Sequence, residues 1–171
     1  CISGSLPRGI ESTILVDISR ICQERDVHLI IDSSYKEIMD CLPYHPFLLK
    51  PNEEELASWF GEIIDSEEAY LFYGQQLIKA GAQNVLLSLG SGGAIFFSQT
   101  KIIRGNSPIG KVVNTACAGD TLLGTFLAGY LTEQPLEETL RKSLAAGSST
   151  AFRKGLTDFS DVKELSKQIE I

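Results

Sequence analysis

The sequence predicts an α/β fold in which a mainly parallel sheet carries helices on both faces, a three-layer α-β-α arrangement. Three observations lead to this prediction. Short apolar runs without polar alternation are typical of parallel strands that are buried on both faces. Segments with helical spacing of apolar residues separate these runs, as crossovers between parallel strands require. The pattern changes once, at a tight hairpin signal in the second half of the chain, so the sheet is expected to be only mainly parallel.

The first half of the chain alternates helices and strands. Ile14, Ile18 and Ile21 recur at helical spacing, which predicts a helix with one apolar face. Gly61 and Gly81 follow two later amphipathic segments and are typical residues at the end of a helix. The expected helices are residues 9–25, 36–42, 53–60 and 66–80. The expected strands are residues 28–32, 47–50 and 85–89.

The second half begins with two strands at 94–98 and 101–104, which are joined across Gln99 and Thr100 as in a hairpin. Three further segments have a helical pattern. They are residues 121–131, 136–152 and 161–169. No internal repeat or low-complexity linker interrupts the chain, so residues 1–171 are expected to form a single α/β domain. The chain starts at Cys1-Ile2 without a leading element, which we interpret as a domain truncated at its N-terminus.

Composition places the chain among ordinary globular proteins, with 43% hydrophobic and 22% charged residues. Its formal net charge is −7 and no basic stripe is present, which argues against a nucleic-acid-binding surface. The four cysteines are far apart in the sequence, as is typical of free thiols in a reducing compartment. No apolar run is long enough to span a membrane, and the expected location is the cytoplasm.

The stretch from Asn114 to Gly124 is a turn of small residues that leads into an apolar helix. The start of a helix presents unpaired N–H groups and the positive end of its dipole, so it favours an anion such as phosphate. Asp120 in this turn has two interpretations. It accepts a proton as a general base from a hydroxyl that attacks phosphorus, or it only caps the helix. Spacing alone favours the cap.

The segment Lys50-Pro51-Asn52-Glu53-Glu54-Glu55-Leu56 also has two interpretations. Asn52 and Glu55 have the spacing of a capping box at the start of a helix. The second interpretation, in which these oxygen atoms organise Mg²⁺ through water, is implied by a resemblance of the segment to a known motif. The two roles are compatible, because a cap at the end of a strand also faces a ligand at the sheet edge.

A polar residue comes at or just after the end of most of the predicted strands. The carboxyl ends of parallel strands lie at the same edge of a sheet, where ligands bind. This periodicity is expected to bring Asp120 to the same edge. The residues concerned are Ser3, Asp32, Lys50 with Asn52, Ser88 with Gly90, and Asn114. Ser88 to Ala94 is a glycine-rich turn, which by itself most often reverses the chain before a hairpin. The small residues from Ala145 to Ala151 are nearly as compatible with close helix packing as with a ligand.

These motifs resemble the ribokinase-like sugar kinases of the phosphofructokinase-B branch. Residues 114–124 resemble the signature Asn/Asp-Thr-x-Gly-Ala-Gly-Asp, with Cys117 in place of the first Gly. The resemblance implies that the backbone around Cys117, Ala118 and Gly119 forms an anion hole for the transferred phosphate. It implies that Asp120 is the catalytic base and contacts the sugar hydroxyl.

The resemblance extends to the other motifs and implies ATP and Mg²⁺ as cofactors. Asn52 and Glu55 would organise Mg²⁺ and phosphate through water. Ser3 and Ser5, in Ser-Gly-Ser-Leu-Pro, would enter the sugar pocket; where Tyr35 stands, the family often has Gly. The residues implied on the nucleotide side are Ser88, Gly90, Gly93 and Asn114, with Ala146 and Ser149 near the adenine.

Within the family, the motifs are most similar to those of 1-phosphofructokinases, followed by tagatose-6-phosphate kinases. The implied reaction transfers the γ-phosphate of ATP to a hexose phosphate, with fructose 1-phosphate giving fructose 1,6-bisphosphate. A homodimer of the full-length protein is compatible with such an enzyme. The match covers essentially all 171 residues but only the C-terminal part of such a kinase. A nucleotide-binding fragment without activity, which lacks the N-terminal lid and sugar site, is therefore the alternative.

Overall fold

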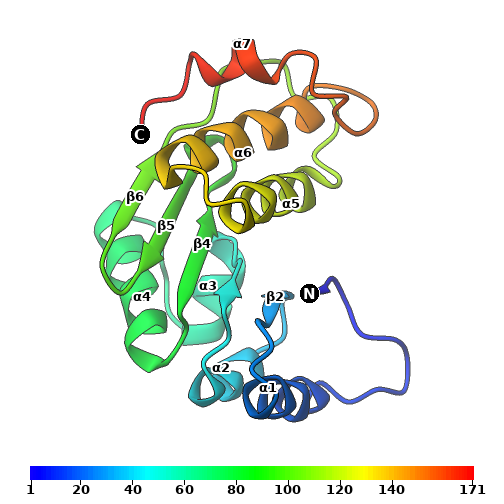
Figure 1. The fold of residues 1–171 in the computed structure, drawn as a ribbon, viewed down its shortest axis with the longest axis vertical. Coiled ribbons are helices and arrows are strands. Elements are labelled where there is room, and N and C mark those ends of the chain that lie inside the picture. The colour runs from blue at the N-terminus through cyan, green and yellow to red at the C-terminus, as the bar shows by residue number, and fades with distance from the viewer. The chain divides into compact units, whose positions relative to one another are not determined.

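Six strands form one sheet in the computed structural model, which describes all 171 residues (Figure 1). The spatial order follows the chain, from β1 to β6. The strands are β1 (Ile2–Ser3), β2 (Ile30–Asp32), β3 (Leu48–Leu49), β4 (Asn84–Ser88), β5 (Ala94–Ser98) and β6 (Ile102–Gly105). Strands β1 to β4 pair in parallel. The connections from β4 to β5 and from β5 to β6 are too short for a parallel crossover, so these strands form hairpins.

The chain divides into two compact units. The first unit consists of Cys1–Leu87 and Phe96–Ile102, and the second consists of Ser88–Ile95 and Ile103–Ile171. The mainly parallel sheet that the apolar runs predicted is confirmed. The single domain over residues 1–171 stays a prediction.

Four α-helices belong to the first unit: α1 (Ile14–Glu24), α2 (Ile38–Cys41), α3 (Glu53–Phe60) and α4 (Glu67–Ala80). The short 3-10 helix η1 (Leu42–Tyr44) follows α2. The start expected for α1 at residue 9 was wrong by five residues. Tight turns precede the helix instead, and Ile14 N still donates to Glu11 O at 3.1 Å, three residues back. Spacing of apolar residues does not distinguish such turns from the first turn of an α-helix.

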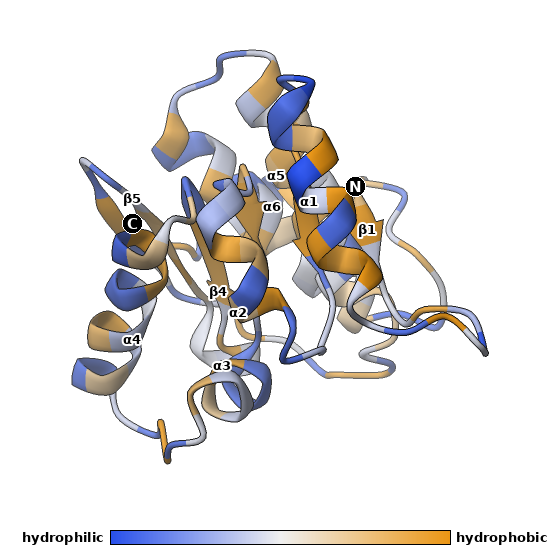
Figure 2. Ribbon diagram, turned by 90° about the horizontal axis from the view of Figure 1, so that it is seen from below, coloured by the Kyte–Doolittle hydropathy of each residue, from blue (hydrophilic) through white to orange (hydrophobic).

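The core of the first unit is made of aliphatic side chains from the strands and helices. Ile31 and Leu49 on the sheet and Leu56 and Leu77 on the helices are fully buried. Gly74 lets α4 approach the sheet closely, because a Cβ atom there would collide with the ring of Phe97. Figure 2 shows β4 and β5 in orange, whereas α1 and α4 carry both blue and orange residues. The helices are therefore amphipathic and the strands apolar, as the sequence predicted.

The second unit contains α5 (Ala118–Leu131), α6 (Leu136–Ala151) and α7 (Val162–Ser166). Helices α5 and α6 pack side by side (Figure 1). Small residues permit this packing, since a Cβ atom on Gly129 would lie 2.7 Å from Thr139 Oγ1. At the other end of the pair, a Cβ atom on Gly147 would lie 3.1 Å from the carbonyl oxygen of Ala118. Helix α6 therefore supports the first turn of α5 directly.

None of the helices combines the length and the apolar character needed to cross a membrane. All four cysteines are free thiols, and only Cys41 among them is buried. Burial raises the pKa of the Cys41 thiol.

Candidate active site

The carboxyl ends of β1, β2 and β3 bring polar side chains together in the first unit. Ser3 pairs in register with Asp32, and Lys50 N donates to Ile31 O at 3.0 Å. Lys50 Nζ lies 2.9 Å from Asp32 Oδ1, and these side chains are 7% and 11% exposed. The predicted edge is therefore confirmed for these residues. The ion pair itself was not predicted, although opposite charges at the ends of two neighbouring strands were a usable signal.

The loop after β1 is held against the residues that follow β2. Gly4 N donates to Asp32 O at 2.9 Å, and Ser33 Oγ donates to Gly4 O at 2.6 Å. The hydroxyl of Tyr35 accepts a hydrogen bond of 3.1 Å from Leu6 N. Tyr35, where the sequence departs from the family pattern, therefore has a defined role in fixing this loop. Ser3 at the end of β1 and Ser5 on the loop are both exposed, as a sugar-pocket entrance would require.

Asn52 and Glu55 form a complete capping box at the start of α3. Glu55 N donates to Asn52 Oδ1 at 2.8 Å, and Asn52 N donates to Glu55 Oε2 at 2.9 Å. The capping interpretation is therefore confirmed. It uses one carboxylate oxygen of Glu55, so the geometry also fits a cation held through water. The structure contains no group of three or more His, Cys, Asp and Glu side chains that could hold a metal directly.

The glycine turn between β4 and β5 reverses the chain through the short helix η2 (Gly90–Gly92). Leu89 N donates to Gly93 O at 2.9 Å across this turn. Gly93 has a φ of +92°, and a Cβ atom there would collide with the carbonyl oxygen of Gly105. The turn therefore needs a glycine at 93 for the close approach of two backbones. The contribution of Ser88, Gly90 and Gly93 to nucleotide binding stays a prediction.

The signature turn of the second unit starts α5 earlier than the sequence indicated. Cys117 is the N-cap residue, and Ala118, Gly119 and Asp120 already belong to the helix. Asp120 is thus the third helical residue, so the interpretation that it caps the helix is wrong. Its side chain is exposed in the first turn, where an anion and a base would be needed.

Cys117 has φ +62° and ψ +6°, the left-handed conformation that glycine adopts without steric cost. The family signature has Gly at this position, so the turn shape is kept here by a residue that is strained in it. The substitution is therefore expected to lower the stability of the turn.

One carbonyl at the end of α6 holds the residues that lead into the signature turn. Val113 N and Asn114 N both donate to Ala151 O, at 2.8 and 3.1 Å. The side chain of Asn114 stays within the turn, where Oδ1 accepts from Ala116 N at 3.0 Å. Ala146 and Ser149, which the resemblance implied on the adenine side, are both fully buried. In this structure they act by packing and by hydrogen bonds inside the unit, and their nucleotide role stays a prediction.

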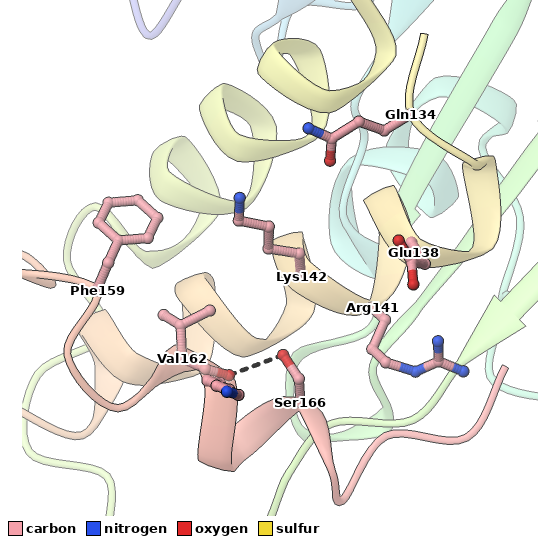
Figure 3. A pocket seen from close by; sticks show the side chains of 8 residues that line it. Gln134, Glu138, Arg141, Lys142, Phe159, Val162 and Ser166 are labelled. Atoms are coloured by element: carbon pink, nitrogen blue, oxygen red, sulfur yellow. Dashed lines mark hydrogen bonds between the residues drawn. The ribbon is translucent and has the colours of Figure 1, made fainter. Parts of the chain in front are cut away.

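A cavity of about 540 Å³ lies along α6 and α7 in the second unit (Figure 3). Its volume suits a small ligand. Figure 3 shows Lys142 and Arg141 extending in different directions, so the two cations do not converge on one point. The lining residues are Gln134, Glu138, Arg141, Lys142, Phe159, Val162, Lys163 and Ser166, none of which belongs to the predicted site. The chemistry of the turn before α5, and not cavity size, therefore identifies the candidate site.

Comparison with known proteins agrees with these local features. The chain is 43% identical over 171 residues to a D-tagatose-1-phosphate kinase of Bacillus licheniformis, covering 99% of the chain and 56% of the relative. It is 33% identical over 170 residues to a 1-phosphofructokinase of Bacillus subtilis, again covering 99% of the chain and 56% of the relative. The chain therefore spans about half the length of these relatives.

Solved structures show the same fold. A phosphofructokinase-2 from Escherichia coli in complex with substrates and products matches with a TM-score of 0.88 and 28% identity. That match covers 97% of this chain and 55% of the other. An Arabidopsis thaliana ribokinase complexed with ribose and ATP matches with a TM-score of 0.75 and 28% identity, covering 94% and 54% of the two chains. The predicted three-layer, ribokinase-like α/β fold is confirmed.

The family model described as pfkB family carbohydrate kinase matches residues 1–163. That match covers the edge formed by β1 to β3, the capping box of α3 and the signature turn before α5. Together with the relatives above, it shows that this chain belongs to the pfkB family of carbohydrate kinases.

Proposed function

We propose that this chain supplies the phosphoryl-transfer site of an ATP-dependent kinase that acts on a ketohexose 1-phosphate. The observation that carries the proposal is the turn before α5. It combines the N-terminus of a 14-residue helix with an exposed carboxylate in its first turn. A site with both groups can bind the transferred phosphate and accept a proton from the attacking hydroxyl.

In the proposed mechanism, Asp120 orients the hydroxyl of the sugar phosphate and takes its proton as the oxygen attacks the γ-phosphorus of ATP. The backbone N–H groups of the first turn, that of Gly119 foremost, stabilise the negative charge that develops on the phosphoryl oxygens. The Ala118 N–H itself donates to Thr115 O in the preceding loop, at 3.2 Å.

Asn52 and Glu55 would hold Mg²⁺ indirectly, through water. The chemistry that Mg²⁺ would supply there is positive charge that offsets the charge of the phosphates. The capping box fixes the Glu55 carboxylate through Asn52 N, at 2.9 Å, so its direction is set before any cation arrives. Such preorganisation is what a weak, water-mediated cation site requires.

The names of the relatives support the proposed substrate class. The two quoted above are named for D-tagatose 1-phosphate and for a 1-phosphofructose, and both names place the first phosphate on carbon 1. The identity is higher to the tagatose 1-phosphate enzyme than to the 1-phosphofructokinase. Tagatose 1-phosphate is therefore a candidate substrate beside fructose 1-phosphate. Neither of these two relatives is named for a 6-phosphate, so tagatose 6-phosphate, the alternative from the sequence, gains no support from their names.

A substrate panel on the naturally expressed protein tests this proposal. ADP release is measured with ATP, Mg²⁺ and the 1-phosphates and 6-phosphates of fructose and tagatose. We expect kcat/KM for one of the 1-phosphates to exceed that for either 6-phosphate by at least about 100-fold, because a misplaced phosphate leaves its binding groups unpaired. A preference for a 6-phosphate would contradict the substrate class, and no ADP release with any sugar phosphate would contradict the kinase.

Two further expectations from the sequence stay outside this proposal. The inactive nucleotide-binding fragment gains no support from the contacts or from the comparisons. The homodimer of the full-length protein stays a prediction.

A further inference from the structure

Two threonines, Thr150 on α6 and Thr121 next to the proposed base, connect α6 to the first turn of α5. Thr121 Oγ1 donates to Cys117 O at 2.9 Å, which closes the first turn of α5. The same oxygen lies 3.0 Å from Thr150 Oγ1 on α6. Thr150 Oγ1 in turn accepts from Thr157 N at 3.2 Å. A continuous chain of hydrogen bonds therefore leads from the loop after α6 to the carbonyl of the left-handed residue Cys117.

The direction of this chain follows from the number of protons. A hydroxyl group donates only one hydrogen bond. Thr121 uses its proton on Cys117 O, so it must accept from Thr150. The order is then Thr157 N–H to Thr150, Thr150 O–H to Thr121, and Thr121 O–H to Cys117 C=O. Replacing either threonine by a residue without a hydroxyl breaks the chain at a defined bond.

A second chain anchors the same loop in an ion pair. Ser149 Oγ donates to Asp161 Oδ1 at 2.5 Å, so Ser149 must accept from Thr157 Oγ1, which lies 2.7 Å away. Arg153 holds the other oxygen of Asp161 at 2.8 Å. Thr157 thus donates through its N–H to one chain and through its O–H to the other. Since Ser149 and Thr150 are almost fully buried, water does not compete well for these bonds.

From these contacts we infer that Thr150, acting through Thr121, is a positioning residue for phosphoryl transfer. It helps to fix the peptide plane between Cys117 and Ala118, whose N–H donates to Thr115 O at 3.2 Å, and thereby the start of the turn that carries Gly119 and Asp120. The inference rests on the proposed function of that turn. It assigns to α6 a role that its buried small residues alone do not explain.

The test uses Thr150→Val and Thr121→Val in the naturally expressed protein, assayed with ATP, Mg²⁺ and the best sugar phosphate of the panel. Valine keeps the shape and removes the hydroxyl. We expect kcat to fall by about 10- to 100-fold, as small misplacements in an active site do. KM for the sugar phosphate is expected to stay within about threefold, because the positioned groups act on the transferred phosphate. Thr150→Ser keeps the hydroxyl and is expected to restore kcat.

Thr139→Val is the matched control. Thr139 is a buried threonine on the same helix, and its Oγ1 has no hydrogen-bond partner. It should leave kcat unchanged. If Thr139→Val lowers kcat as much as Thr150→Val does, the effect is one of general packing and the inference is wrong.

Asp120→Asn, measured in parallel, separates the two claims. If it abolishes turnover while Thr150→Val and Thr121→Val keep normal kcat, the proposed function stands and the positioning role is overturned. If Asp120→Asn keeps normal turnover, the proposed function fails and the positioning role fails with it. Should Thr150→Val not fold, Thr121→Val breaks the neighbouring bond of the same chain and decides the question alone.

Discussion

Lys50 and Asp32 form an ion pair, 2.9 Å between Nζ and Oδ1, that joins the ends of two neighbouring parallel strands. Both side chains are almost completely buried. Burial makes the two charges depend on each other, since an unpaired charge at this position would have lost its water without gaining a partner. The pair therefore belongs to the framework that holds the strand ends together.

Removing one member of this pair should destabilise the first unit strongly. We expect Lys50→Met or Asp32→Asn to lower the free energy of unfolding by about 3–5 kcal/mol, and the double variant to lose less than the sum. Urea unfolding curves measure this. Asp17→Asn is the control, because Asp17 forms an exposed pair with Arg20 at 3.5 Å and should cost no more than about 1 kcal/mol. Equal, small losses for the buried and the exposed pair would contradict the assignment.

Cys117→Gly should restore the family residue at a left-handed position. Removing the left-handed strain should stabilise the variant by roughly 1–2 kcal/mol. The greater freedom of glycine in the unfolded chain should destabilise it by about 0.4–1 kcal/mol. We therefore expect a thermal unfolding temperature equal to or slightly above that of the wild type. Cys22→Gly, inside α1, is the control and should cost roughly 0.5–1 kcal/mol. A lower melting temperature for Cys117→Gly than for Cys22→Gly would show that no strain was present at 117.

Glu55→Gln should separate capping from cation binding. A glutamine at this position still accepts from Asn52 N, so the capping box and the stability of α3 should survive. The lost negative charge should raise the Mg²⁺ concentration needed for half-maximal turnover, while the melting curve stays unchanged. Asn52→Ala provides the comparison, since it removes a cap and should cost about 1 kcal/mol. An unchanged Mg²⁺ requirement in Glu55→Gln would leave Glu55 with the capping role alone.

Arg153 forms ion pairs with Asp158 and Asp161, and this cluster should make the protein less stable as the pH falls into the acid range. Hydrogen bonds from Ser160, followed by Arg153, lower the pKa of Asp158. Burial raises the pKa of Asp161, but the hydrogen bonds from Ser149 and Arg153 outweigh it, and the net shift is downward. Carboxylates with a lowered pKa in the folded state contribute stability above their unfolded pKa and lose it as the pH falls through the folded value.

Arg153→Gln should therefore lower the melting temperature at about pH 7, and the difference from the wild type should shrink below about pH 4, where the carboxylates of the unfolded chain protonate. Arg20→Gln on α1 serves as the control, because both of its acidic partners are largely exposed. A difference of the same size at about pH 3 and pH 7 would show that Arg153 acts by packing and not by its charge.

The sequence was sufficient for the features that depend on local pattern. The apolar runs located the strands, and the spacing of Asn52 and Glu55 predicted a capping box that the structure contains. The sequence was insufficient for features that depend on the conformation of one residue or on the alignment of two elements. The positive φ of Cys117 cannot be read from a residue type that seldom adopts it, so α5 was expected three residues too late. The contact between Lys50 and Asp32 depends on how two strands align, and the contact between Thr121 and Thr150 depends on how two helices align.

The most direct test of the whole account is the turnover of Asp120→Asn. Asparagine keeps the size of the side chain but cannot accept the proton of the attacking hydroxyl. Loss of the charge in the first turn of α5 costs about 0.3–1 kcal/mol of stability, too little to unfold the protein. The measurement is kcat with ATP, Mg²⁺ and the preferred sugar phosphate, together with the Kd for ATP and the melting temperature. If Asp120 is the base, kcat falls by about 10²–10⁴-fold while the ATP affinity and the melting temperature stay nearly unchanged. A kcat close to that of the wild type would contradict the role of Asp120 as the base.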